Sequence, residues 1–333
     1  MELKLSILDQ TPIIKGGNAA LALKNSLALA EMADKLGYHS ILYSEHHDVE
    51  AYGSSSPEIL AATVLARTKN IKVGTGGIML RNYSAFKIAE WAKMLAILYP
   101  HRFILGLGKA PGGLKDAVLA LNGHKLPVLN NINEKLEEII AYLKEQNYKD
   151  TALFAQPAHV SALPEITWLG SGESSAKEAA KYGISYSMAD FIADGSNTEI
   201  HALYQEEFNQ FGYNEHPSFQ VAISVSVAET LEQARYNAFG MVYQFLESRK
   251  ILAPSALKSS EEVEALIHEH EDQTLFKTLL EKVVIGTPDT IQSKLEDKAL
   301  QYGTHDLVLL SNMFREEDRL FTFKNIIQQR PLG

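Results

Sequence analysis

The chain has 333 residues, of which 46% are hydrophobic and 22% are charged, a composition that excludes a disordered chain, a collagen-like fibre and a coiled coil. Its 31 basic and 41 acidic residues give a net charge of −10, which repels phosphate backbones and argues against nucleic-acid binding. Cysteine is absent, so disulfides, thiolate catalysis and sulfur-ligated metal sites are excluded.

Neither a membrane span nor a signal peptide is predicted. No run of the sequence approaches the ~18 apolar residues that a membrane helix needs. The stretch from Met1 to Asp9 is charged within its first few residues and lacks the apolar region and cleavage site of a signal peptide. We therefore expect a cytoplasmic protein without a membrane partner.

Short apolar or β-branched runs alternate with longer segments of helical spacing. Predicted strands cover residues 3–8, 40–44, 71–80, 103–107, 165–169, 184–188, 220–228 and 306–310. Predicted helices cover residues 19–36, 57–67, 85–98, 131–145, 174–182, 198–211, 229–247 and 315–329. Strands that alternate with helices indicate a parallel sheet. About eight such units favour an α/β fold of the (β/α)8 barrel type over an open doubly wound sheet.

One stretch interrupts the alternation. Residues 250–288 contain a charged segment, 259–272, and a helical piece, 273–282. We interpret this stretch as an insertion between the seventh and eighth strands. Since no repeat, low-complexity segment or interdomain linker stands out, one domain is expected over residues 1–333.

In a (β/α)8 barrel, the residues just past the carboxyl ends of the strands build the site. Asp9 and Gln10 follow the first strand, where they form either a polar turn or part of the barrel mouth, and Asp9 is a candidate cofactor-binding residue. Glu45, His46 and His47 follow the second strand. Adjacent histidines on a strand end point to opposite sides, so one should face the mouth and the two do not easily chelate one metal.

The histidine at the mouth admits three interpretations. It is an acid–base or charge-stabilising group beside Glu45, a structural histidine in a hydrogen-bonded turn, or a metal ligand. We favour the first and expect no metal site. The His-Glu run over residues 268–271 lacks the spacing of a zinc protease motif and is predicted to be a solvated face.

Glycine-rich segments follow the third and fourth strands. Gly74, Gly76 and Gly77 weaken the third strand, which indicates either an unusual backbone or the close approach of a flat ligand. The segment 106–113 is neither a dinucleotide-binding GxGxxG motif nor a Walker loop. It still offers Lys109 as a point charge for a phosphate.

The fifth strand runs into Gly170-Ser171-Gly172-Glu173-Ser174-Ser175, directly before a helix. Small residues, hydroxyl groups and a helix N-terminus together form an anion site. Simple capping of the helix by Ser171 or Ser174 would account for the same residues. Because Lys109 lies on the neighbouring strand end, we favour a phosphate site.

Taken in this order, the segments resemble the bacterial luciferase-like family of flavin-dependent monooxygenases, over nearly the whole chain. The stretches that carry the resemblance are Ser6–Pro12, Gly37–His47, Ser54–Glu58, Val73–Leu80, Asn82–Ser84, Tyr99–Gly112, Trp168–Ser171 and Gly286–Pro288. The resemblance implies a (β/α)8 barrel that binds FMN, or in some branches the deazaflavin F420, at its mouth.

The resemblance also implies roles for single residues. His46 matches a catalytic histidine near the reactive face of the flavin ring, with Glu45 as its neighbour in the motif. The Gly76–Gly77 bond matches a non-prolyl cis peptide behind the ring. Lys109 matches a position that is usually an arginine and binds the phosphate. The residues that match the phosphate loop are Gly170, Ser171, Gly172 and Ser175.

Lysine at position 109 keeps the charge of arginine but loses its bidentate fork. Weaker flavin binding would suit a protein that takes reduced flavin from a separate reductase. The leading hypothesis is therefore an FMN-dependent monooxygenase of a two-component system, acting with O2 on a small molecule of unknown identity. Loops 49–56 and 112–131 and the insertion are candidates for a lid.

Other functions stay open. They are an F420-dependent oxidoreductase on the same barrel, a flavin-binding protein without turnover, and a metal-dependent hydrolase that uses His46 and His47. As the family members are usually dimers through helices of the early part of the barrel, the resemblance implies a homodimer.

Overall fold

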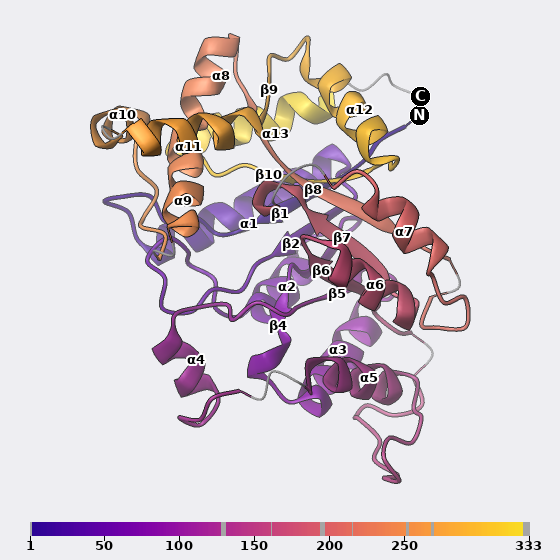
Figure 1. Ribbon diagram of the computed structural model, residues 1–333. Helices are drawn as coiled ribbons and strands as arrows, with labels where there is room; N and C mark the ends of the chain where they lie inside the picture. The colour runs from indigo at the N-terminus through magenta and orange to yellow at the C-terminus, as the bar shows by residue number, and fades with distance from the viewer. Residues whose placement is uncertain are drawn as a thin grey trace.

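The computed structural model describes residues 2–127, 131–160, 162–193, 197–214, 216–250, 253–267 and 270–328. In these residues, eight parallel strands close a barrel in the order β10, β1, β2, β3, β5, β6, β7, β8, because β10 pairs with both β1 and β8. Figure 1 shows the helices around them. The barrel strands are β1 (Lys4–Asp9), β2 (Ser40–Tyr43), β3 (Lys72–Thr75), β5 (Phe103–Gly108), β6 (Glu165–Gly170), β7 (Ser185–Ala189), β8 (Phe219–Val227) and β10 (Asp306–Leu310).

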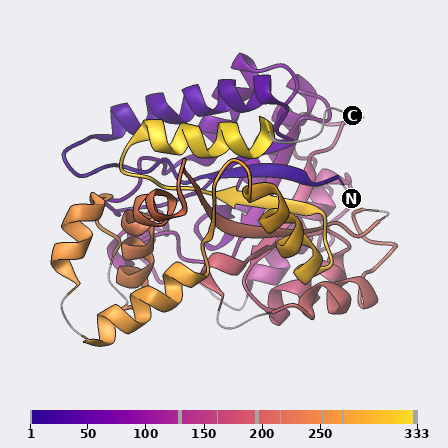
Figure 2. The same cartoon turned by 90° about the horizontal axis from the view of Figure 1, so that it is seen from above.

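Helices follow the strands along the chain and cover the outside of the barrel. The (β/α)8 fold predicted from the sequence is thereby confirmed. Figure 2 shows α1 and α13 lying side by side on one flank of the barrel. The helices are α1 (Ala19–Leu36), α2 (Pro57–Arg67), α3 (Ala85–Leu98), α4 (Lys115–Leu121), α5 (Ile132–Leu143), α6 (Glu173–Tyr182), α7 (Ile200–Glu206), α8 (Leu231–Asn237), α9 (Phe239–Arg249), α10 (Ser260–Leu266), α11 (His270–Glu281), α12 (Ile291–Tyr302) and α13 (Glu316–Gln328).

Alternation along each strand separates two hydrophobic clusters. On β1, Leu5 and Ile7 belong to the cluster between the barrel and its helices, whereas Leu8 belongs to a second cluster inside the barrel. The second cluster also contains Leu42, Ile104 and Leu310, and it continues through side chains of α9 to α11 in the insertion. This continuous packing is compatible with one domain over residues 1–333. The domain boundaries themselves stay a prediction.

The third predicted strand, 71–80, is divided in the structure. It consists of β3, a cis peptide between Gly76 and Gly77, the short strand β4 (Ile78–Met79) and a 3-10 helix (Leu80–Asn82). β4 pairs with β5, so the chain stays at the barrel wall after the cis bond.

Other differences from the prediction are smaller. The predicted helix 229–247 is two helices, α8 and α9, that meet at Ala238. Near the start of α9 the backbone of the 257–258 segment approaches closely, since a Cβ on Gly240 would lie 2.5 Å from the carbonyl oxygen of Lys258. Helix 198–211 is shorter, as α7 ends at Glu206. The patterns above predict neither α4 nor α12.

The insertion between the seventh and eighth barrel strands is confirmed and is largely ordered into helices. It contains α10, α11 and the short strand β9 (Val284–Gly286), which pairs with the far end of β8. Ser259 and Glu262 form a capping box at the start of α10. The predicted solvated face at residues 268–271 includes His268 and Glu269, which lie outside the described residues. Among the described helices, none is long and apolar enough to cross a membrane.

A buried ion pair joins β1 to α13. Arg319 donates to Asp9 Oδ1 at 2.7 Å and to the carbonyl oxygen of Ser311 at 2.9 Å, and both charged side chains are almost fully buried. A buried pair of this kind is costly to break from one side, because the remaining charge is left in a low-dielectric interior.

We therefore expect Arg319→Met to lower the free energy of unfolding by about 3–5 kcal/mol. Arg315→Ala is the control, since Arg315 forms an exposed pair with Asp318 near the start of the same helix and should cost less than about 1 kcal/mol. Urea denaturation measures both. Equal, small losses in the two variants would contradict the assigned importance of the buried pair.

Candidate active site

The segments that the sequence predicts to be functional lie at one end of the barrel. β1, β2, β5 and β6 are parallel members of the same sheet, so their carboxyl ends share one rim. Glu45, His46, Lys109 and the loop from Ser171 follow these ends directly. The barrel mouth is therefore the candidate active site.

His46 continues the inward-facing side of β2, two and four residues after Ser44 and Leu42. Its Nδ1 lies 3.1 Å from Ser44 Oγ, and its ring stacks on Tyr52 with ring centroids 4.0 Å apart. Burial, with a smaller effect of His47, lowers the pKa of His46 from 6.5 to about 4. The imidazole is therefore neutral at pH 7 and can donate one hydrogen bond and accept another.

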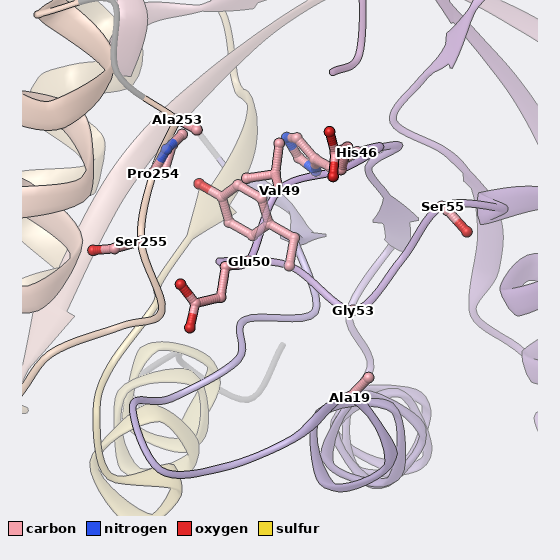
Figure 3. Close-up of a pocket in the computed structure, with 11 residues that line it drawn as sticks. Ala19, His46, Val49, Glu50, Gly53, Ser55, Ala253, Pro254 and Ser255 are labelled. Atoms are coloured by element: carbon pink, nitrogen blue, oxygen red, sulfur yellow. The ribbon is translucent and has the colours of Figure 1, made fainter. Parts of the chain in front are cut away.

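An open cavity of about 630 Å³ lies beside His46. Figure 3 shows one side formed by the chain from His46 to Ser55 and the other by Ala253, Pro254 and Ser255 of the insertion. Two of the predicted lid segments thus line it. The two sides are held together where Leu257 exchanges backbone hydrogen bonds with Ile13 and Lys15, at 2.7 and 2.8 Å.

Tyr52 stacks on His46 and lies near Glu247 of α9. Burial and the carboxylate of Glu247 raise the pKa of the Tyr52 hydroxyl above its usual value of 10. Glu247 itself accepts hydrogen bonds from the backbone N–H of Ser255 at 2.9 Å and from its hydroxyl at 2.8 Å. The carboxylate of Glu247 therefore holds Ser255, which lines the side of the cavity opposite His46.

Glu45 faces away from His46. Its Oε1 accepts hydrogen bonds from His47 Nε2 at 2.8 Å and from the Tyr83 hydroxyl at 3.1 Å, and its Oε2 accepts one from the backbone N–H of Met79 at 3.0 Å. The two adjacent histidines thus point to opposite sides, as predicted. Glu45 holds the segment that follows the Gly76–Gly77 bond, and the structure gives it a positioning role rather than contact with the mouth.

In the part of the chain that the structure describes, no group of three or more His, Asp or Glu side chains is placed to hold a metal ion. Because His46 and His47 diverge, they do not form the pair that the hydrolase hypothesis needs.

The Gly76–Gly77 peptide is cis, as the resemblance implied. A Cβ on Gly76 would lie 2.9 Å from Leu42 Cβ, and one on Gly77 would lie 2.7 Å from Leu169 Cδ1. Both neighbours are too close for any side chain, so glycine is required on each side of the bond. The backbone itself thus forms this part of the inner wall.

The loop before α6 has the form of an anion site. Gly172 is the N-cap residue of α6 and no side chain caps the helix, so the simple capping by Ser171 or Ser174 considered above does not occur. The carbonyl oxygen of Ser171 accepts from Asn197 Nδ2 at 3.1 Å, and that of Gly172 accepts from the Tyr186 hydroxyl at 3.0 Å. With the carbonyls bound from behind, the N–H groups of the first helical turn are available to an anion.

Gly170 and Ser175 are packed together in this loop. Ser175 is buried, and a Cβ on Gly170 would lie 2.3 Å from Ser175 Cβ. Any other residue at position 170 would displace Ser175 from the loop. The four residues predicted for phosphate binding therefore form one compact turn.

Lys109 lies next to this turn but already has a partner. The pairing of Gly108 with Leu169 places Lys109 beside Gly170. Lys109 Nζ is 2.7 Å from Glu178 Oε2, and both side chains are partly exposed. The structure thus brings Lys109 next to the predicted phosphate loop, and the carboxylate of Glu178 contacts the lysine.

Asp9 was predicted to bind the cofactor, and the structure does not place it at the mouth. Its Oδ1 is bonded to Arg319 and to the backbone N–H of Thr11 on the outer side of β1. The alternation from Leu8, which faces inward, accounts for this direction. Gln10, one residue further, faces the mouth instead.

The sequence analysis missed Asn312. This residue follows β10, and its Nδ2 donates to Gln10 Oε1 at 2.7 Å. Its Oδ1 is buried without a hydrogen-bond partner among the described residues. Its side chain therefore holds Gln10 from the last strand of the barrel. The strand-end rule, applied to the eighth strand, would have found it.

Comparisons with known proteins agree with this geometry. A family model described as luciferase-like monooxygenase matches residues 3–305. The chain is 33% identical to the Bacillus subtilis protein YceB, covering 97% of this chain and 98% of that one. It is 32% identical to N-acetyl-S-alkylcysteine monooxygenase of the same organism, covering 93% and 92%.

Solved structures share the fold. The crystal structure of apo-MsnO8 superimposes with a TM-score of 0.88 at 28% identity, over 98% of each chain. The oxygenating component of 3,6-diketocamphane monooxygenase from Pseudomonas putida, in complex with FMN, gives 0.72 at 18% identity, over 98% and 97%. An F420-dependent secondary alcohol dehydrogenase gives 0.66 at 16% identity, over 99% and 100%.

The depressed pKa of His46 predicts a specific pH dependence. Between pH 6.5 and 4 the unfolded chain binds a proton at this residue that the folded chain does not, so acidification favours unfolding. Compared with His46→Gln, the wild type should lose up to about 2 kcal/mol more stability between pH 7 and pH 5. Urea denaturation at both pH values measures this.

His39, whose pKa burial lowers to about 3, is present in both proteins, so its contribution cancels. Parallel stability profiles for the wild type and the variant would show that His46 titrates normally and would contradict the assigned neutral state.

Proposed function

Since the chain belongs to the luciferase-like monooxygenase family, we propose that it oxygenates a small organic molecule with O2 and with reduced FMN as cosubstrate. The observation that carries this proposal is the shared rim: a neutral, half-buried His46 and an uncapped, glycine-rich helix start before α6 lie at the same end of the barrel. The imidazole donates or accepts a hydrogen bond, and the helix start binds an anion.

The residues present fit a flavin. The phosphate would lie on the turn formed by Gly170, Ser171, Gly172 and Ser175, with Lys109 beside it. The ring would lie over the Gly76–Gly77 backbone, where no Cβ blocks its approach. Bound reduced FMN would supply the electrons that activate O2.

The protein's own residues have separate tasks in this proposal. His46, oriented by Ser44 and Tyr52, donates or accepts a hydrogen bond at the reacting atoms. Glu45 positions the backbone after the cis peptide through Met79. The inner cluster, which runs from Leu8 to α9, keeps the inside of the mouth apolar and excludes water.

The flavin is proposed to be exchangeable and to arrive from a separate reductase. Position 109 holds a lysine where the resemblance implies an arginine with its bidentate fork, and Glu178 contacts this lysine. F420 is the second candidate, because one of the proteins that share the fold is named for F420 dependence. In that case the reaction would be hydride transfer without O2.

The similarity to N-acetyl-S-alkylcysteine monooxygenase supports small N-acetylated thioethers as the first substrates to assay. The cavity beside His46 has room for such a molecule, since ligand sites of ~300–1,000 Å³ are usual and this cavity measures about 630 Å³. Oxygen from ¹⁸O2 should appear in the product, and its absence would exclude monooxygenation of that substrate.

A homodimer through α2 and α3 is proposed. Ile59 on α2 and Met94 and Leu98 on α3 are apolar side chains with 63%, 52% and 62% of their surface exposed. Such residues on consecutive helices of the early barrel are suited to contact with a second copy. The absence of cysteine suits a reducing compartment, and we propose the cytoplasm.

Titration with FMN, riboflavin and F420, each oxidised and photoreduced, tests the cofactor. We expect reduced FMN to bind more tightly than riboflavin or F420, because its phosphate reaches the α6 turn. Lys109→Ala should weaken FMN binding about ten-fold and leave riboflavin binding unchanged. Preference for F420 would favour hydride transfer, equal weakening of both flavins would refute the phosphate contact, and no binding would overturn the proposed function.

The dimer is tested by Ile59→Glu combined with Leu98→Glu. Burying these carboxylates in an apolar interface is unfavourable, so light scattering after gel filtration should give the mass of one chain instead of two. Leu300→Glu is the control, because Leu300 is an apolar residue of α12 with 82% exposure and lies outside the proposed interface. A wild type with the mass of one chain would contradict the dimer.

A further inference from the structure

A carboxylate stands beside the predicted phosphate site and contacts its lysine. Glu178 lies on α6, the helix whose N-terminus forms the anion site, and its Oε2 is 2.7 Å from Lys109 Nζ. The same oxygen accepts a hydrogen bond from Trp168 Nε1 at 3.1 Å. Since Trp168 is fully buried, it fixes the carboxylate in place.

Chain geometry explains why the two charges meet. On β5, Leu107 packs against the helices and Gly108 faces inward, so Lys109 returns to the outer side. On β6, Trp168 also faces outward, toward α6. Lys109 and Trp168 therefore converge on Glu178 from two neighbouring strands.

This pairing changes what the site offers to a phosphate. Lys109 and Glu178 together carry no net charge, so the lysine attracts a dianion less than a free lysine would. A phosphate that contacts Lys109 also comes near the carboxylate of Glu178. Two negative charges a few ångströms apart repel strongly where bulk water does not screen them. Lysine is a point charge without a fork, so it cannot serve both anions with fixed bidentate geometry.

We propose that Glu178 determines the flavin specificity of this site by competing with the flavin phosphate for Lys109. It lowers the preference for FMN over riboflavin and keeps the flavin exchangeable. This inference rests on the proposed function. The competition also explains why a lysine suits position 109. A single Lys109–Glu178 contact breaks more easily than the bidentate pair that an arginine would form with the same carboxylate.

Glu178→Gln tests the competition. The amide keeps the size of the side chain and an oxygen that can accept from Trp168 Nε1, but it has no charge. FMN should bind about ten-fold more tightly to the variant, riboflavin should bind as to the wild type, and FMN should dissociate more slowly. Added salt should weaken FMN binding more in the variant than in the wild type, because Lys109 is no longer neutralised.

Two further variants support the comparison. Glu207→Gln is the control. It removes a surface carboxylate that lies 3.8 Å from Lys177 of α6, and it should leave the affinities for FMN and riboflavin unchanged. Glu178→Ala should show the same direction as Glu178→Gln. It gives a second test if the amide variant fails to fold, as judged by its melting temperature.

The outcomes separate this inference from the proposed function. If the wild type binds FMN more tightly than riboflavin, and the Glu178 variants bind FMN with unchanged or lower affinity, then Glu178 orients Lys109 instead of competing for it, and the inference is overturned alone. If the wild type binds neither flavin, oxidised or reduced, the inference falls together with the proposed function.

Discussion

Closure of the parallel barrel is the constraint on which the candidate site depends. Because β10 pairs with both β1 and β8, the carboxyl ends of the strands share one rim. Segments far apart in the sequence, such as His46 and Ser175, are thereby brought to the same end. The two-residue period of each strand then decides which side chains face the mouth and which face the helices.

The same alternation places paired polar side chains behind the mouth. At three strand ends, a residue on the outer side is held by a partner: Asp9 by Arg319, Glu45 by His47 and Lys109 by Glu178. The neighbouring inward positions carry Gln10, His46 and Gly108. Charged groups thus stabilise the rim from outside, while the inner surface keeps neutral groups that can meet a flat ligand.

Much of this could be predicted from the sequence, because strand and helix periods and the strand-end rule depend on local patterns. The barrel, the insertion, the divergence of the two histidines and the position of Lys109 followed from such patterns. Asp9 lies on the outer side of β1, because the alternation continues beyond Leu8; its role in cofactor binding stays a prediction. The partner of Lys109 could not be predicted, since Glu178 is distant in sequence and looks like any exposed residue of a helix. Asn312 was missed because the eighth strand end carries no glycine or histidine to mark it.

The charge state of the mouth has a chemical consequence. His46 is neutral because its surroundings are poor in water, and Lys109 is compensated by Glu178. In a chain with a net charge of −10, long-range attraction of an anionic flavin is weak or absent. In the proposed function, recognition of the flavin therefore depends on short-range contacts with the N–H groups before α6 and with the open backbone at Gly76 and Gly77. A site that selects by shape and hydrogen bonds, with little net charge, lets its ligand dissociate readily, which suits the proposed exchange of a reduced flavin with a separate reductase.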